Sequence, residues 1–158
     1  SVLQMIHTLR DASEQLLHIQ TSHYTLAKIM EHTRRVALPG STLFLISDFH
    51  DLDQECEQHL FELTRHCDIN FCHIHDALET QLPPPGSYQV THGDKRFNLN
   101  TRNTELRQQF EQQFKDRQAR IKRLCGQLRM GCLSFETASP ILSLLQQVFG
   151  RKKPGRRR

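Results

Sequence analysis

The stretch STLFLISDFHDLDQE, residues 41–55, constrains the fold of this chain more than any other part of it. Its apolar run is continuous rather than alternating, which predicts a strand at 42–47 that is buried on both faces of a parallel sheet. The run ends at Asp48, and a helical pattern of apolar residues begins a few positions later. Asp51 is placed to cap that helix, with Gln54 three residues further on, as in a capping box.

The spacing of apolar residues predicts the remaining elements, and their order alternates helices with strands. That alternation favours an α/β fold with a parallel, doubly wound sheet. Three strands are few for such a sheet, so we expect further strands upstream of Ser1. The predicted elements are helices at 2–18, 26–36, 52–67, 102–128 and 140–149, the last capped by Ser139, strands at 69–74 and 132–135, and a hairpin at 87–99.

Length and charge divide the chain into one domain, 1–150, and a basic tail, 151–158. The tail RKKPGRRR holds six Lys or Arg, and removing them from the net charge of +4 leaves −2 for the domain. We expect a disordered tail that makes weak contacts with acidic surfaces such as nucleic acid, lipid or protein. No apolar run is long enough to span a membrane and no signal peptide is present, which favours the cytoplasm.

The cysteines and histidines are interpreted as structural residues. The five cysteines are odd in number and lack C-x-x-C spacing, which is typical of reduced core residues. The segment HCDINFCHIHD could hold zinc, yet His73 and His75 share one strand face while Cys72 points the other way. Histidines at the margins of a strand are therefore the preferred interpretation.

Asp48 is the strongest candidate for a ligand site. In doubly wound sheets ligands bind beyond the carboxyl ends of the strands, and a carboxylate there suits a hard cation such as Mg²⁺. The competing interpretation is that Asp48 or Asp51 only caps the next helix. The sequence contains no G-x-S-x-G, P-loop or G-x-G-x-x-G motif, so neither catalysis nor a small-molecule substrate is expected.

Several segments resemble the bacterial family called domain of unknown function 58. They are LPGSTLFLISDFHDLD, then RHCDINFCHIHDALETQLPPPGSY, then a Thr-containing step into a long basic helix, and the resemblance runs from about Val2 to Phe149. Members of that family are similar in fold to von Willebrand factor A domains, whose strand order is 3-2-1-4-5-6. The resemblance implies a Rossmann-like α/β fold with a partly parallel sheet, of which this chain supplies the second half, strands four to six, with an extra β-hairpin.

The same resemblance implies a metal-ion-dependent adhesion site. Such a site uses an Asp-x-Ser-x-Ser loop, a Thr before the third helix and an Asp after the fourth strand. Asp48 matches the last position, and Thr25 or Ser22 is the hydroxyl candidate. The Asp-x-Ser-x-Ser loop is not in this chain. We therefore expect no cofactor in this chain alone, and Mg²⁺ or Mn²⁺ in a full-length parent whose upstream residues complete the site.

The function that the resemblance implies is a non-enzymatic protein-interaction or adaptor module. Proteins of this kind are commonly encoded beside MoxR-type AAA+ ATPases, which makes such an ATPase the expected partner, and upstream residues could anchor the parent to a membrane. The hairpin at 87–99 could be a recognition element. Two alternatives stay open: a binder of nucleic acid or acidic surfaces through 151–158, and a metal-dependent hydrolase using Asp48 with Asp51 or Asp53. The apolar edge of strand 42–47 also predicts self-association.

Overall fold

The chain folds into a small parallel sheet and a separate hairpin. The computed structural model describes residues 2–15, 24–92 and 95–150. The sheet has three parallel strands in the order β1-β2-β5, and the two hairpin strands, β3 and β4, pair antiparallel. The strands are β1 (Thr42–Ser47), β2 (Asp68–His75), β3 (Ser87–His92), β4 (Lys95–Asn100) and β5 (Gly131–Glu136).

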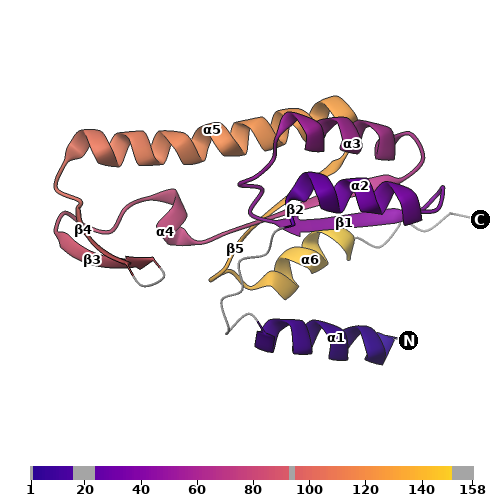
Figure 1. Cartoon of the computed structure of the whole chain (residues 1–158), viewed down its shortest axis with the longest axis horizontal. Coiled ribbons are helices and arrows are strands. Elements are labelled where there is room, and N and C mark those ends of the chain that lie inside the picture. Colours follow the sequence, from indigo (N-terminus) through magenta and orange to yellow (C-terminus); the bar gives the residue numbers. More distant parts are fainter. Residues whose placement is uncertain (1, 16–23, 93–94, 151–158) are drawn as a thin grey trace, which may run out of the picture.

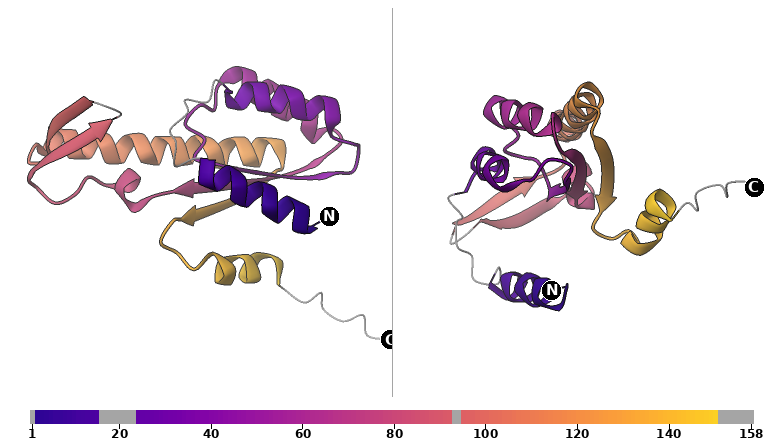
Figure 2. Two further views of the ribbon diagram at one scale, coloured as in Figure 1. Left: turned by 60° about the horizontal axis from the view of Figure 1, so that its bottom comes forward. Right: turned by 90° about the vertical axis from the view of Figure 1, so that its right-hand side faces the viewer.

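Helices cover the sheet unequally on its two faces. Three of them lie together on one face, α6 lies on the other, and α1 stands apart from both layers (Figures 1 and 2). The mixed α/β class predicted from the sequence is confirmed. The helices are α1 (Val2–Gln15), α2 (Leu26–Val36), α3 (Gln54–Thr64), α4 (Ala77–Thr80), α5 (Thr104–Leu128) and α6 (Ile141–Phe149), and α2, α3 and α5 share the first face.

The hydrophobic core fills the space between the sheet and these three helices. Phe71 of β2 is fully buried there, in one cluster with Leu60 and Leu63 of α3, Met30 of α2 and Ile121 of α5. Each such side chain contributes about 1.5–3 kcal/mol through removal from water. The core therefore holds the carboxyl ends of β1 and β2 in a defined position beneath α5.

Strand β1 is where the predicted burial is wrong. Among the described strands β1 pairs only with β2, so it lies at the edge of the sheet. Phe44 is 50% exposed and Ile46 is 69% exposed, although the ring of Phe149 from α6 approaches Phe44 with centroids 6.0 Å apart. The continuous apolar run therefore marks a strand correctly, but not one that is covered on both faces in this chain.

The predicted helix ends differ from the observed ones where a different residue caps the helix. Helix α5 begins at Thr104 because the Asn103 side chain accepts from the N–H groups of Glu105 and Leu106. Helix α6 begins at Ile141 with Pro140 as its N-cap and no side-chain cap, so the prediction that Ser139 caps it is wrong. Residues 16–18 of the first predicted helix, and the tail 151–158, lie outside the described residues.

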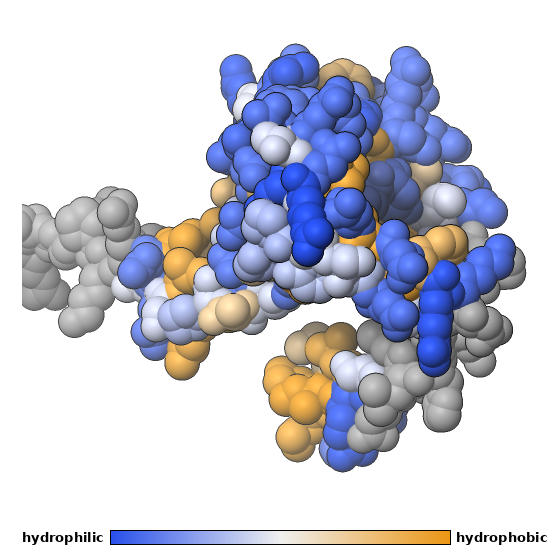
Figure 3. Space-filling view, turned by 90° about the vertical axis from the view of Figure 1, so that its left-hand side faces the viewer, coloured by the Kyte–Doolittle hydropathy of each residue, from blue (hydrophilic) through white to orange (hydrophobic). Residues whose placement is uncertain are grey.

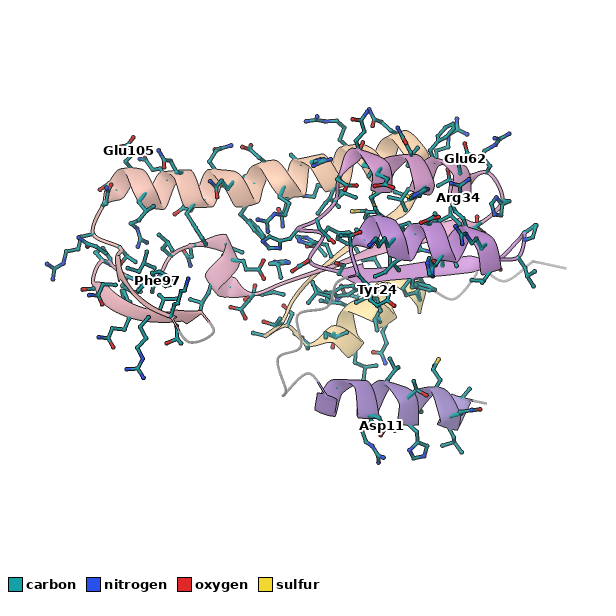
Figure 4. The ribbon with its side chains drawn as sticks, viewed as in Figure 1. Asp11, Tyr24, Arg34, Glu62, Phe97 and Glu105 are labelled. Carbon is teal, nitrogen blue, oxygen red and sulfur yellow. The ribbon has the colours of Figure 1, made fainter. Side chains whose placement is uncertain are left out.

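The hairpin extends from one end of the molecule. Figure 4 shows Phe97 of β4 and Glu105 of α5 at that end, and Arg34 of α2 and Glu62 of α3 at the opposite end. Thr101 anchors the base of the hairpin: its hydroxyl donates to the carbonyl of Pro84 at 2.8 Å and accepts from the N–H of Gly86 at 2.9 Å. The hairpin therefore projects from a fixed base. None of the described helices is long and apolar enough to cross a membrane.

Candidate functional site

Asp48 lies at the carboxyl end of β1, where the sequence places a ligand site. Its Oδ1 accepts from the backbone N–H of His50 at 3.2 Å and from the Ser47 hydroxyl at 3.4 Å. Its Oδ2 lies 3.1 Å from Nδ1 of His50, and the side chain is 54% exposed. The carboxylate is therefore oriented by its own loop but remains open to solvent.

The protonation equilibrium of Asp48 follows from these contacts. Partial burial raises the pKa of this carboxyl, but the hydrogen bonds and positive charge of His50, with the Ser47 hydroxyl, outweigh it and bring the pKa below its ordinary value. Asp48 is consequently a carboxylate at neutral pH, which is the form that binds a cation.

Phe49 fixes the path of the chain directly after Asp48. It adopts a left-handed backbone conformation, with φ of 53°, which is unusual for a residue with a large side chain. Its ring is buried and stacks on Phe71 of β2, with centroids 4.3 Å apart and planes within 8°. Such a conformation costs about 1–3 kcal/mol and persists only where the surroundings enforce it. The stacked ring thus sets the position of the carboxylate beside it.

The next two acidic residues of the loop accept hydrogen bonds from the amino ends of two different helices. Asp53, not Asp51, is the N-cap of α3, since its Oδ1 accepts from the N–H of Cys56 at 2.8 Å. Asp51 instead reaches across to α2, where its Oδ2 accepts from the N–H of Leu26 at 2.7 Å. The prediction that Asp51 caps the following helix is therefore wrong, because the capped helix precedes it in the chain.

This bond brings the segment of Thr25 beside the loop that carries Asp48. Thr25 is the N-cap of α2, and its Oγ1 accepts from the N–H of Lys28 at 3.3 Å. Because Asp51 accepts a hydrogen bond from the N–H of Leu26, the residue after Thr25, the amino end of α2 and the loop after β1 are held together. Ser22, the other hydroxyl candidate, lies outside the described residues.

Asp48 and Thr25 carry oxygen atoms of the chemical kind that a hard cation takes as ligands. Both offer oxygen ligands of the kind that Mg²⁺ and Mn²⁺ bind. Within residues 2–15, 24–92 and 95–150, however, no group of three or more His, Cys, Asp or Glu side chains is arranged to hold a metal ion. Two protein oxygens leave most positions of an octahedral shell to water, to a partner or to another part of the protein.

Arg117 of α5 connects the loop of Asp48 to the end of β2, a link that the sequence did not predict. Its Nη1 lies 3.4 Å from Nδ1 of His50 and 3.7 Å from Oε2 of Glu79, whose Oε1 accepts from the N–H of Asp76 at 3.0 Å. The His50 nitrogen donates to Asp48 only when it carries a proton and accepts from Arg117 only when it does not. The proton position on His50 therefore decides which neighbour it binds.

Two histidines lie buried behind this link. His73 and His75 stack with centroids 5.1 Å apart, which confirms that they share one face of β2. Phe114 of α5 lies over both rings, with centroids 6.2 Å from His73 and 5.3 Å from His75. His73 is 2% exposed, and its Nε2 has no hydrogen-bond partner among the described residues. Burial, followed by the charge of His75, lowers the pKa of His73.

Comparison with known proteins supports the family resemblance. A family model described as "Protein of unknown function DUF58" matches residues 1–120 of this chain. A search of curated proteins finds no match. Among solved structures, a conserved hypothetical protein, BatB, from Bacteroides thetaiotaomicron aligns with a TM-score of 0.43 and 9% sequence identity, over 84% of this chain and 61% of that protein. The chain thus spans less than two thirds of the length of that protein.

Proposed function

The chain belongs to the family of proteins of unknown function DUF58, and from this premise we propose that it is a non-enzymatic protein-interaction module. Its recognition site is the carboxyl end of the sheet around Asp48, and its partner is a MoxR-type AAA+ ATPase. In this proposal the sheet is the second half, strands four to six, of a von Willebrand factor A-like domain. The observed order β1-β2-β5, all parallel, is compatible with that assignment.

The proposal rests on the solvent exposure and position of the Asp48 carboxylate. Its carboxylate is ionised and 54% exposed, and it sits at the sheet edge where the loop after β1 meets the amino end of α2. Asp48, with Thr25 as the hydroxyl ligand, would hold Mg²⁺ or Mn²⁺. A carboxylate of the partner would then complete the coordination shell of the bound cation. Both residues lie on segments fixed by the core, which suits a recognition surface.

The same loop disfavours the alternative of a metal-dependent hydrolase. That alternative needs Asp51 or Asp53 as a second reacting carboxylate beside Asp48. Each of these two already accepts a backbone hydrogen bond at a helix terminus, at 2.7 and 2.8 Å respectively. A carboxylate engaged in this way would have to leave its helix unsatisfied in order to reach a substrate or a metal-bound water.

The test is cation binding by calorimetry on the full-length protein, followed by capture of a purified MoxR-type ATPase with and without Mg²⁺. We expect Asp48→Ala to abolish Mg²⁺ and Mn²⁺ binding and to weaken capture by at least tenfold. Asp68→Ala is the matched control, because Asp68 is an exposed carboxylate at the opposite end of β2. Unchanged cation binding in Asp48→Ala would overturn the metal site, and capture that ignores both Mg²⁺ and Asp48 would overturn the recognition surface.

A further inference from the structure

The hairpin of β3 and β4 has an apolar face that does not belong to the core. Val90 pairs with Phe97 across the two strands, and Tyr88 pairs with Leu99, so all four side chains lie on one face of the hairpin. Val90 is 42% exposed and Phe97 is 54% exposed, and none of the four is a member of the core cluster. The hairpin lies at one end of the molecule, apart from the three-stranded sheet (Figure 1). This face is therefore accessible to a partner.

The two strands of the hairpin also differ in how their outer edges are protected. Among the described strands, β3 and β4 pair only with each other, so each has backbone N–H and C=O groups along its outer edge that no neighbouring strand binds. Proteins commonly protect such edges with charged residues or proline. β4 contains Lys95 and Arg96, whereas β3, of sequence SYQVTH, contains no proline, Asp, Glu, Lys or Arg. The outer edge of β3 is therefore the one more open to pairing with another strand.

The base of the hairpin is held in place by hydrogen bonds within the chain. The Tyr88 hydroxyl donates to the carbonyl of Pro84 at 2.9 Å, and the Thr101 hydroxyl joins the same carbonyl to the N–H of Gly86. A strand edge that is ordered before binding loses less conformational entropy when a partner binds. The edge of β3 is therefore suited to recognition.

The charge of the hairpin favours an acidic partner. Residues 87–102 contain three cations, Lys95, Arg96 and Arg102, and one carboxylate, Asp94, so their net charge is +2. The three cations form no ion pair within the part of the chain that the structure describes. Cations without a partner in the chain attract negatively charged groups of another molecule.

We propose that the outer edge of β3 binds an extended acidic peptide, which adds to the hairpin as a third strand. The peptide backbone pairs with β3, and its apolar side chains, at alternate positions, extend the face of Tyr88 and Val90. Its carboxylates lie on the opposite, polar face of the hairpin, which includes Arg96 because Arg96 pairs with Thr91. A single-stranded nucleic acid would use the cations but not the edge of β3. This surface is separate from the Asp48 loop and does not rest on the function proposed above.

Fluorescence anisotropy with the full-length protein and labelled synthetic peptides tests the proposal. The probe, Asp-Val-Glu-Val-Glu-Val-Asp, alternates acidic and apolar residues. In one control peptide Lys replaces every acidic residue, and in another alternate backbone nitrogens are methylated, which prevents strand pairing. EDTA in the buffer makes the result independent of any cation bound at Asp48. We expect the acidic peptide to bind about tenfold more tightly than either control peptide.

Three outcomes of this experiment would overturn the proposal. They are no binding of the acidic peptide, equal binding of the acidic peptide and a control peptide, and tighter binding of an oligothymidine than of the acidic peptide.

Variants and hydrogen exchange locate the contact on β3. Val90→Lys and Arg96→Glu should each weaken binding of the acidic peptide about fivefold, whereas Val36→Lys on α2 and Lys122→Glu on α5, at exposed positions outside the hairpin, should leave it unchanged. The peptide should also slow amide hydrogen exchange in β3 more than in β4, because the added strand pairs with β3 alone. Unchanged exchange in β3 would place the peptide elsewhere and overturn the proposal. Exchange in the wild-type protein decides this even if a variant folds poorly.

Discussion

Three neighbouring acidic residues after β1 have three different roles, and one of these roles depends on the tertiary structure. Asp53 caps α3, as a residue just before a helical pattern is expected to do. Asp48 faces solvent at the sheet edge. Asp51 accepts a hydrogen bond from the N–H of Leu26, the first residue of α2, which lies well before it in the sequence. No local pattern could assign Asp51 to that helix, because the two segments meet only when α2 packs beside α3.

Removing the Asp51 carboxylate tests its assignment. Asp51→Ala should lower the free energy of unfolding by about 1 kcal/mol, since it removes an acceptor and a negative charge from the amino end of α2. Urea unfolding followed by circular dichroism measures this change. Asp68→Ala removes an exposed carboxylate and should stay within about 0.5 kcal/mol of wild type. Equal stabilities for all three proteins would contradict the capping role.

His73 gives the fold a dependence on pH. Burial keeps its folded-state pKa below the value of the unfolded chain, which is near 6.5. Below that value the unfolded state binds more protons than the folded state, so stability falls as the pH decreases. The groups around His73 are His75 on its own strand, Phe49 and Asp48 from the loop after β1, Glu79 of α4, and Phe114 and Arg117 of α5.

Unfolding at two pH values measures this effect. Wild-type protein should lose more stability between pH 7 and pH 5 than His73→Phe does, by about 1 kcal/mol, because each pH unit below the unfolded pKa costs at most about 1.4 kcal/mol. His32→Phe is the matched control at an exposed histidine and should retain the wild-type dependence. If His73→Phe showed the same loss as wild type, another group would be responsible.

At the scale of elements, the hairpin depends on one buried hydroxyl. Thr101 is fully buried at the junction of β4 and α5, and its side chain joins two backbone groups of the turn before β3. The segments YQV and RFNL, separated by THGDK, predicted the strands of this hairpin. The sequence did not predict the role of Thr101, since this role depends on its hydrogen bonds to Pro84 and Gly86, which precede the hairpin in the chain.

Thr101→Val tests the junction with nearly unchanged shape. It leaves the N–H of Gly86 without its acceptor, at a cost of about 1–3 kcal/mol, while the carbonyl of Pro84 keeps the hydrogen bond from the Tyr88 hydroxyl at 2.9 Å. We expect faster amide hydrogen exchange in β3 and β4, and unchanged exchange in β2 and the second half of α5. Thr91→Val, at an exposed position of the same hairpin, should leave exchange as in wild type. Uniform loss of protection would mean that the hairpin and the core unfold together.

At the scale of the whole molecule, α1, β1 and α6 are among the elements that expose apolar side chains. Figure 3 shows those of α1 gathered on one flank of the helix, at the bottom of the molecule. β1 and α6 expose others on the face of the sheet away from the core. They include Val2, Leu3, Met5, Ile6 and Leu9 of α1, Phe44 and Ile46 of β1, and Ile141, Leu142, Val148 and Phe149 of α6. Exposed apolar surface beside an unpaired strand edge favours association.

Sedimentation velocity tests this prediction on the chain of residues 1–158. We expect concentration-dependent association of the wild type, weakened by Ile46→Lys, which places a charge on the exposed face of β1. Ile29→Lys is the control, since Ile29 is an exposed apolar residue on α2, on the opposite side of the sheet. A monomer at all concentrations would contradict the prediction, and equal weakening by both variants would place the contact elsewhere.

The sequence by itself determined where the helices and strands lie, because the spacing of apolar residues and the turn residues are properties of short segments. The parallel strands, the hairpin and the helices follow from the spacing of apolar residues, although the four-residue helix α4 is too short to show a period. Asp48 could be placed at a strand end for the same reason. Tertiary structure alone decided the exposure of β1, the bond from Asp51 to α2 and the contact of Arg117 with His50. Each of these joins separate elements or depends on what covers a surface, and only packing brings such groups together.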